Sequence, residues 1–482
     1  MRSKRNRFVS RFSIIQGGGR LDATVKSMKN TSLHIAVFAL LVGGAWHTVA
    51  AAGGATVTVD YSKPKQTIEG FGAAIPWVAG NINYFSAADQ STILDALYST
   101  TKPSAALSWV RVHTFMCQFN PSSGSYNFND PLIQDEVSWV SRVKATYGVT
   151  NLWASNWTPP AWMKSAGSCD GGYLLPQYYS DFANDQVLWL QDWKAAVGTE
   201  ANVLSLQNEP TVSTSYDSCT YTTDQINAAT AYVRPAMTNA ALTTKYTVPE
   251  TDVYGGTSFF DSNWAIPILS YPGNPAYIDL MSTHGYGQLQ NLSGPCLTCQ
   301  QYNKEIWQTE VMKSRGTFDA SINEAQTWTT SIYQALNQGD FSAWFYWWVF
   351  YNSNNNGFLI QYNSSTTPWT ISSIPKRVYA MGNFSRFMRP GSTLLTSTST
   401  STSLESTAAL PTTGKLALVL SNTSSGSITV TVNLTNSSSP PTSVTPFTTS
   451  ATQNQAQGSA ISLTNGTFTI TVPSHVVITV IG

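Results

Sequence analysis

The 482-residue sequence predicts an α/β protein, a (β/α)8 TIM barrel with an attached antiparallel β-sandwich side domain. The first observation behind this prediction is a repeat of short apolar runs and longer amphipathic stretches between about residues 68 and 390. Strand and helix alternation over this length suits a closed parallel barrel. The second is a change of pattern from Ser392 onward, where alternating strand-like runs are separated by Ser, Asn, Gly and Pro.

The body of the chain is acidic and carries few charges. Charged residues make up 11% of the sequence, less than half of the usual ~25%. Eight of the 26 basic residues fall in the first 29 positions, where Asp22 is the sole acid, so the chain beyond residue 52 has 18 basic and 25 acidic side chains. An acidic body without a basic patch argues against nucleic acid as a partner. The 16 Trp, 22 Tyr and 20 Phe argue against disorder.

Residues 1–52 are predicted to be an upstream extension followed by a secretory signal peptide. From Met28 the chain has one early cation, a short apolar run over 35–46 and small residues at 50–52, which is the layout of a signal peptide. Residues 1–27 suggest an over-long gene prediction. The alternative is a cytoplasmic tail on a membrane anchor, although the apolar run is short for a membrane span. We expect a secreted or extracellular protein, or a periplasmic one, with no membrane partner after signal removal.

The folded part is predicted to begin with a strand at 53–66, which contains ATVTVDYS and could pair with the C-terminal domain. The catalytic barrel is assigned to 67–390. Its apolar runs, the predicted strands, are 106–112, 151–155, 203–207, 278–282, 305–309 and 343–350. Helix-like segments such as 181–197 and 319–338 lie between them, with Leu, Ala and Trp at helical spacing.

The side domain is assigned to 391–482. Its predicted strands include KLALVLSN, SITVTVNLTN, FTITV and VVITVIG. Residues 392–407 contain 12 Ser or Thr in 16 positions, and this tract fits a flexible linker and a strand equally well.

Five cysteines, in a chain expected to be exported, allow at most two internal disulfides and leave one thiol free. Two of them, Cys296 and Cys299, form a C-x-x-C without a second such pair or a nearby H-x-x-x-H. A zinc site therefore has weak support, and we expect a small local disulfide or two reduced thiols there.

Two glutamates stand directly after strand-like runs, where barrel enzymes place their catalytic side chains. VLSLQNEP ends at Asn208, Glu209 and Pro210, and EIWQTEV places Glu310 just after another run. If Glu209 closes barrel strand four and Glu310 closes strand seven, the two carboxylates face each other across the barrel mouth. Glycosidic bond cleavage needs such a pair. A helix N-terminal charge would explain either glutamate alone, but the pair favours catalysis.

Aromatic side chains near the same strand ends suggest a sugar substrate, because flat rings stack on sugars. Trp157 and Trp348 are the preferred candidates for substrate contact, while other Trp residues at these ends fit the core equally well. His113 and His284 also follow apolar runs. A general-base role is conceivable for them, but we expect neutral, hydrogen-bonding imidazoles. Motifs of serine hydrolases, zinc proteases and P-loop proteins are absent from the sequence.

Seven segments in order resemble glycoside hydrolase family 30. They are TIEGFGAA, LSWVRVHT, WASNWTPPAWMK, LSLQNEP, STHGYG, IWQTEV and YAMGNFSRFMRPG. The resemblance covers the chain from residue 55 to the C-terminus, and ASNWTPPAWMK and FSRFMRPG are most similar to the xylan-degrading branch. It implies a barrel fused to a β-sandwich that includes an N-terminal strand.

The resemblance also implies roles for individual residues. Glu209 would be the acid/base and Glu310 the nucleophile of a retaining mechanism, which requires carboxyl groups only ~5 Å apart. Asn208 would hold the sugar 2-hydroxyl. Arg111 and Tyr286 would hydrogen-bond around Glu310 and keep it ionised.

Two departures from the family pattern bear on specificity. Members that recognise glucuronic acid branches are expected to carry an arginine just after the tryptophans of strand eight, where this chain has Phe350 and Tyr351. Branch-dependent glucuronoxylan cleavage is therefore in doubt. The second departure is Asn156 at a position where proline is usual.

The function predicted from these observations is a secreted retaining endo-β-1,4-xylanase acting on xylan or glucuronoxylan. One alternative is another family 30 specificity, namely β-1,6-galactanase, β-1,6-glucanase or glucosylceramidase, which would keep Glu209 and Glu310. The other is a non-catalytic carbohydrate-binding protein. The expected partner is a polysaccharide or oligosaccharide, the chain is expected to be a monomer, and neither a cofactor nor a metal is predicted because acid/base and nucleophile suffice.

Overall fold

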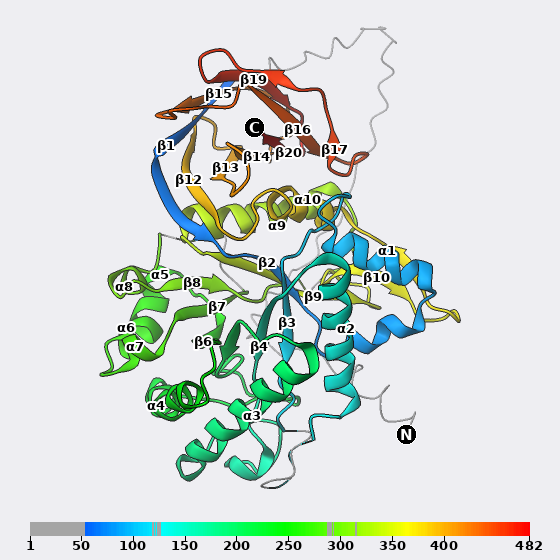
Figure 1. The fold of residues 1–482 in the computed structure, drawn as a ribbon. Coiled ribbons are helices and arrows are strands. Elements are labelled where there is room, and N and C mark those ends of the chain that lie inside the picture. Colours follow the sequence, from blue (N-terminus) through cyan, green and yellow to red (C-terminus); the bar gives the residue numbers. More distant parts are fainter. Residues whose placement is uncertain are drawn as a thin grey trace, which may run out of the picture. The chain divides into compact units, whose positions relative to one another are not determined.

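Eight parallel strands close into a barrel in the computed structural model (Figure 1). They are β2 (Gly70–Ala74), β3 (Trp109–His113), β4 (Asn151–Ser155), β5 (Val203–Ser205), β6 (Lys245–Val253), β7 (Leu280–Tyr286), β8 (Glu305–Gln308) and β9 (Ala343–Tyr351). β9 closes the ring because it pairs in parallel with both β8 and β2. The predicted (β/α)8 barrel is confirmed.

The structure describes residues 54–117, 120, 122, 127–286, 292, 294–313 and 316–482. The predicted extension and signal peptide at 1–52 lie outside these residues. Within the described part, every helix is too short or too polar to cross a lipid bilayer.

Helices follow the barrel strands and cover the outer face of the sheet (Figure 1). The longer ones are α1 (Ala87–Tyr98), α2 (Pro131–Tyr147), α3 (Tyr179–Val197), α4 (Thr223–Asn239), α9 (Ile322–Tyr333) and α10 (Lys376–Ser385). The shorter ones are α5 (Thr257–Phe260), α6 (Ile266–Leu269), α7 (Asn274–Tyr277) and α8 (Leu297–Gln301). Side-chain caps start several of them: Asp130 caps α2, and Thr222 with Gln225 forms a capping box on α4.

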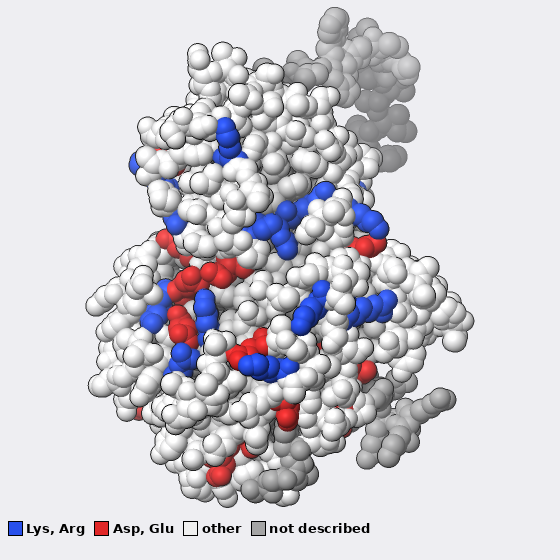
Figure 2. Space-filling model, viewed as in Figure 1, with Lys and Arg blue, Asp and Glu red and all other residues white. Residues whose placement is uncertain are grey.

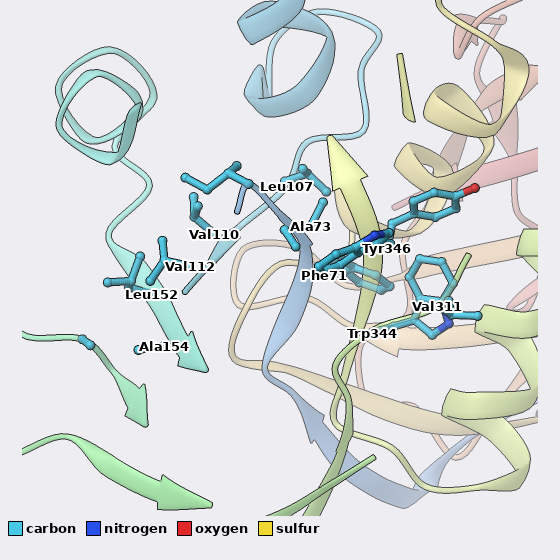
Figure 3. Packing of buried hydrophobic residues seen from close by; sticks show 14 of the residues in the cluster. Phe71, Ala73, Leu107, Val110, Val112, Leu152, Ala154, Val311, Trp344 and Tyr346 are labelled. Atoms are coloured by element: carbon cyan, nitrogen blue, oxygen red, sulfur yellow. The ribbon is translucent and has the colours of Figure 1, made fainter. Parts of the chain in front are cut away.

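Alternate residues of each barrel strand point outward into the main core. Val110 and Val112 of β3 lie beside Leu152 and Ala154 of β4 (Figure 3), and all four are at most 2% exposed. Because side chains alternate across a strand, the residues between them point into the barrel. The lower interior is filled by seven buried apolar side chains: Trp109, Trp153, Val203, Leu280, Trp307, Ala343 and Phe345. The inward-pointing residues nearer the carboxyl ends of the strands pack on this layer.

The side domain is a ten-stranded sheet folded over its own apolar core. Its strands are β1 (Gly54–Ile68), β12 (Ser392–Ser399), β13 (Leu404–Leu410), β14 (Ala417–Asn422), β15 (Ile428–Thr435), β16 (Ser443–Thr449), β17 (Ala456–Gln457), β18 (Ile461–Ser462), β19 (Thr467–Val472) and β20 (Val477–Ile481). The Ser/Thr tract at 392–407 forms β12 and the start of β13, so it is strand and not linker.

The N-terminal strand β1 lies between β12 and β15 in this sheet. It pairs antiparallel with β12, as Val57 opposite Ser399, and parallel with β15, as Val57 opposite Val432. The sheet is therefore antiparallel except at the β1–β15 pair. Two further strands, β10 (Phe358–Asn363) and β11 (Thr370–Ser373), extend the barrel sheet beside β9.

Polar side chains join the barrel helices to the side domain. Asn383 of α10 donates to the Phe447 carbonyl at 3.0 Å, and Gln326 of α9 donates to the Asn422 carbonyl at 2.6 Å. On the face shown in Figure 2, charged side chains are sparse in the upper part of the molecule and gather lower down, around the barrel. From Pro390 to the end of the sequence, Glu405 and Lys415 are the sole charged side chains.

Two disulfides link Cys117 to Cys169 and Cys296 to Cys299, and Cys219 is a buried free thiol. Two bridges and one free thiol are the limit that five cysteines allow, and the C-x-x-C forms the local disulfide. Burial raises the pKa of Cys219 to about 12, which makes it an unreactive thiol at neutral pH.

Candidate active site

The carboxyl ends of the barrel strands bring three glutamates together. Glu209 follows β5, the fourth barrel strand, and Glu310 follows β8, the seventh. This strand assignment agrees with the prediction. The third carboxylate, Glu250, lies within β6 and is fully buried.

Glu310 accepts hydrogen bonds from two donors, one cationic and one neutral. Nη1 of Arg111, on β3, donates to one carboxylate oxygen at 2.6 Å, and the hydroxyl of Tyr286, on β7, donates to the other at 2.6 Å. Burial raises the pKa of Tyr286 well above its usual range, so the phenol keeps its proton and remains a donor. Two hydrogen bonds that favour the ionised carboxylate suit a nucleophile. Both contacts are those that the resemblance predicts.

Glu209 has a different environment. Its backbone has a φ of +49°, and its amide donates to the Glu250 carbonyl at 2.9 Å. One carboxylate oxygen lies 3.0 Å from Nδ1 of His284. Burial raises the pKa of Glu209, against the opposing effect of His284. A carboxyl group with a raised pKa suits the role of an acid/base catalyst.

The two carboxyl groups are close neighbours. One oxygen of Glu209, one of Glu310 and a ring nitrogen of His284 all lie within 4.8 Å of one another. Retaining glycosidases hold their two carboxyl groups about 5–5.5 Å apart, whereas inverting enzymes need about 6.5–9.5 Å to admit a water molecule. The separation in this chain fits retention.

Arg111 lies at the centre of the site and is fully buried. Besides Glu310, its guanidinium donates to Asn208 at 2.7 Å and to Glu250 at 3.0 Å. Its carbon lies 4.6 Å from the ring centre of Trp157 and 5.5 Å from that of Trp347. Although burial alone would lower the pKa of Arg111, Glu250 and Glu310 together raise it. The guanidinium therefore fixes both the nucleophile and Asn208.

The carboxylate of Glu250 accepts hydrogen bonds from three side chains and is closed off from solvent. Beside Arg111, Ser155 donates to it at 2.9 Å and Nε1 of Trp153 donates at 3.1 Å. Nε2 of His284 lies 3.8 Å away. Burial alone would raise the pKa of Glu250, but Arg111 and His284 outweigh it and hold the pKa at about 2.

His284 lies among three carboxylates from different strands, which no local sequence pattern brings together. Burial would lower the pKa of this imidazole, but Glu310, Glu209 and Glu250 surround it and raise the pKa to about 10. Nη2 of Arg111 also lies 3.5 Å from Nε2 of His284. The carboxylates favour the protonated ring, in contrast to the neutral imidazole that the sequence analysis expects.

His113 behaves as predicted. Its Nδ1 accepts the Phe115 amide at 2.6 Å, so Nε2 carries the proton and faces Asp217 at 3.2 Å. Burial lowers the pKa of His113, which keeps the ring neutral. The ring stacks on Trp157 with 4.5 Å between ring centres.

The aromatic candidates are largely covered by their neighbours. Trp157 is 2% exposed and Trp348 is 9% exposed. Trp157 packs against Arg111 and His113, so it supports the site and offers almost no free face. Trp348 stacks on Trp347 with 5.2 Å between ring centres and lies 4.7 Å from the ring of Tyr351. Sugar stacking by Trp157 and Trp348 stays a prediction.

Asn156, which replaces a proline, helps to hold Asn208. Its carbonyl accepts the Asn208 amide at 2.7 Å, and its side chain accepts from Thr114 at 3.0 Å. Asn208 is thus fixed from two sides, because Arg111 binds its side-chain oxygen.

Phe350 and Tyr351, the positions expected to carry a branch-binding arginine, differ from each other in their surroundings. Phe350 is fully buried and stacks on Trp139 of α2, with 5.6 Å between ring centres. Tyr351 is half-buried beside Trp348. Phe350 is therefore part of the core.

Glu209, His284 and Glu310 have the residue types of a metal site. Their ligand atoms, however, already engage one another, Arg111 and Tyr286. A protonated imidazole has no lone pair to donate to a cation. The arrangement thus suits proton transfer better than metal binding.

Glu250 was missed by the sequence analysis. It stands in KYTVPE, which is not among the predicted strands. Proline is unusual in a central strand, yet the structure places Pro249 and Glu250 within β6.

No family model matches the chain. The chain is similar to a glucuronoxylanase of Bacillus subtilis (strain 168), with 24% identity over 443 residues that cover 88% of this chain and 90% of the relative. It is also similar to an endo-1,6-β-D-glucanase of Aspergillus fumigatus, with 24% identity over 433 residues that cover 79% of this chain and 83% of the relative.

Solved structures agree on the architecture. The catalytic domain of GH30 xylanase C from Talaromyces cellulolyticus matches with a TM-score of 0.76 at 23% identity, covering 88% of this chain and 99% of that one. This similarity shows the barrel and its attached sheet domain.

Proposed function

We propose that this chain, a member of glycoside hydrolase family 30, is a secreted, retaining endo-β-1,4-xylanase. That it is a glycosidase follows from the family. The observation that carries the retaining mechanism is the approach of Glu209 and Glu310 to within 4.8 Å in unlike environments. We assign Glu209 as the acid/base and Glu310 as the nucleophile.

In the first step, Glu310 attacks the anomeric carbon while Glu209 gives its proton to the leaving glycosidic oxygen. The C–O bond to the leaving sugar breaks as the bond to Glu310 forms. The hydrogen bonds from Arg111 and Tyr286 to Glu310 weaken as the carboxylate loses its charge and becomes an ester. In the second step, Glu209 takes a proton from water, which attacks the same carbon and frees Glu310.

Xylan is the preferred substrate class for two reasons. The segments ASNWTPPAWMK and FSRFMRPG resemble the xylan-degrading branch, the first of them includes Asn156 and Trp157 at the site, and a glucuronoxylanase is among the relatives. The arginine expected for branch recognition is replaced by the buried Phe350. We propose cleavage that does not depend on glucuronate branches.

A β-1,6-glucanase is the second candidate, because a relative with that name is equally identical to this chain. The test is product analysis after incubating residues 53–482 with linear xylan, glucuronoxylan, β-1,6-galactan and β-1,6-glucan. Xylo-oligosaccharides from branched and unbranched xylan alike are expected. Products from a β-1,6-glycan alone would overturn the xylan assignment and leave the mechanism intact.

Stereochemistry tests the mechanism separately. NMR of the first anomer released from the substrate that is cleaved should show retention of the β configuration. The α anomer as first product would contradict the roles given to Glu209 and Glu310. Export rests on residues 28–52 and is tested by N-terminal sequencing of protein recovered from the medium or periplasm, with a start near residue 53 expected.

A further inference from the structure

We infer that Glu250 is a positioning residue, a buried carboxylate between Arg111 and His284 that serves as their shared counter-ion while the reacting carboxylates change charge. The inference rests on the proposed glycosidase function for its kinetic consequence. Its structural basis is the position of Glu250 between the two cations. It lies 3.0 Å from Nη2 of Arg111 and 3.8 Å from Nε2 of His284.

Each of these cations serves a different catalytic group. Arg111 binds Glu310 at 2.6 Å, and His284 meets Glu209 at 3.0 Å. One buried carboxylate therefore links the holder of the nucleophile to the holder of the acid/base. Its backbone takes part as well, because the Glu250 carbonyl accepts the Glu209 amide at 2.9 Å.

A charge count shows why a third carboxylate is needed. The retaining mechanism starts with an anionic Glu310 and a protonated Glu209. With Glu250 anionic and with Arg111 and His284 cationic, the cluster is then neutral. After the first step Glu310 is an ester and Glu209 is anionic, so the cluster is neutral again. Without Glu250 the same cations would face a single anion in either state. An uncompensated buried charge is costly, and His284 is the cation that can lose its proton.

Glu250 is suited to this role because it is removed from the reaction. Its side chain is fully buried, and its other partners are the uncharged donors Ser155 and Trp153. The titratable groups that face His284 are Glu209 from the end of β5, Glu250 from β6, Glu310 from the end of β8, Arg111 from β3 and Tyr286 from its own strand. Asp252 is the next acid along β6 and acts on Glu209 from a greater distance.

The first test observes the proton on His284 without measuring activity. Residues 53–482 contain His113, His284 and His475, so ring-nitrogen NMR of 15N-histidine-labelled protein gives three sets of signals. His475→Gln assigns one set, and the neutral ring of His113 identifies a second. In the parent protein, His284 should keep both ring protons at pH 8. A neutral His284 at that pH would overturn the inference, whether or not any glycan is cleaved.

The second test compares Glu250→Gln with Glu324→Gln. Glu324 is also a buried partner of an arginine, Arg377, but it lies on α9 away from the site. Glu250→Gln should make His284 titrate near neutral pH, lower kcat about 10- to 100-fold and add an ionisation to the pH profile of kcat/KM. Glu324→Gln should lower thermal stability and leave both profiles unchanged. Identical His284 titrations in the parent and Glu250→Gln would overturn the inference.

Glu250→Asp provides a test if the glutamine variant does not fold. The shorter carboxylate keeps its charge, so His284 should remain protonated at pH 8 while kcat falls less than in Glu250→Gln. Loss of the proton in Glu250→Asp would contradict the counter-ion role. If the parent cleaves no glycan but His284 titrates as expected, the proposed function fails and the role of Glu250 stands.

Discussion

Among the described residues, the barrel contains two fully buried arginines with different sets of partners. Arg111, in the active site, donates to the side chains of Glu310, Glu250, Asn208 and Ser155. Arg377, on α10, donates to Glu324 and Asn356, and also to the backbone carbonyls of Asp319 and Phe358. Both guanidinium groups are saturated with acceptors. They differ because the acceptors of Arg111 named here all belong to side chains, whereas Arg377 also donates to two backbone carbonyls.

An arginine bonded to carbonyls fixes the course of the chain, whereas one bonded to side chains fixes functional groups. Arg377 joins the segment before α9 to the segment before β10, and a single carboxylate balances its charge. Arg111 faces two carboxylates, and one of them reacts. Stability should therefore depend most on Arg377 and turnover most on Arg111 and its partners. The following predictions test this division.

Glu310→Gln should give the largest effect. The substitution keeps the shape of the side chain and removes the charge that attacks the anomeric carbon, so kcat should fall by about 10⁵-fold. The measurement is the rate of reducing-sugar release from the preferred glycan, with circular dichroism to show that the variant is folded. If Glu310→Gln cleaves as fast as the parent, the assigned mechanism is wrong.

Arg377→Met should reduce stability more than any other arginine-site change and spare turnover. It leaves Glu324 buried without its cation, which costs about 3–5 kcal/mol of unfolding free energy. Urea unfolding measures the loss, and kcat per folded molecule should equal that of the parent. The double variant Arg377→Met/Glu324→Gln should recover part of the stability, and no recovery would contradict an ion-pair origin.

Arg111→Lys tests the role of the active-site arginine in turnover. Lysine keeps one charge but cannot reach Glu310, Asn208 and Glu250 together, because it lacks the planar fork of donors. We expect kcat to fall about 100-fold through misplacement of the nucleophile. An Arg377→Lys control should leave kcat unchanged. Equal effects of the two lysine variants on kcat would remove the distinction between the arginines.

The pH dependence of stability follows from two shifted pKa values in the active site. Glu250 has a pKa of about 2, below its usual 4.5, so it stabilises the fold above pH 4.5 and this contribution is lost as the pH falls toward 2. His284 has a pKa of about 10, above its usual 6.5, so its contribution is complete below pH 6.5 and is lost as the pH rises through 10. Thermal melting between pH 2 and 11 should therefore show both contributions in full between pH 4.5 and 6.5, with stability falling on either side. In Glu250→Gln, the fall in melting temperature on the acid side should be smaller. An unchanged fall would show that other groups cause it.

Asn156→Ala should have the smallest effect. The alanine leaves the Thr114 hydroxyl without its acceptor, which costs about 1 kcal/mol. The carbonyl that holds Asn208 is unchanged, so kcat should stay within about threefold of the parent. Thr114→Val in the Asn156→Ala background should restore part of the stability. A large loss of kcat in Asn156→Ala would show that its side chain contributes to the site.

The sequence predicted the fold and two of the three central carboxylates because those signals are local. Glu209 and Glu310 follow plain apolar runs, and the 101 positions that separate them leave room for three further strands. Glu250 was missed because residues 245–253 were not predicted as a strand. The environment of His284 could not be predicted because it depends on three carboxylates that are up to 101 positions apart.

Two further features could not be predicted from the sequence, because they too depend on residues far apart in the chain. The tract at 392–407 is ambiguous by composition, and pairing of β12 with β1 decides that it is a strand. The burial of Trp157 and Phe350 follows from neighbours on other strands and on α2, which no local pattern reveals.

The position of β1 has a consequence for the order of folding. This strand leaves the ribosome before the barrel, yet its partners Ser399 and Val432 lie more than 300 residues later in the chain. Until synthesis is nearly complete, β1 has neither neighbour. Once both neighbours exist, β1 pairs between β12 and β15 and joins the two parts of the sheet. Pairing of such high sequence separation is slow. The side domain should therefore be the last part of the protein to fold, after the barrel is already assembled.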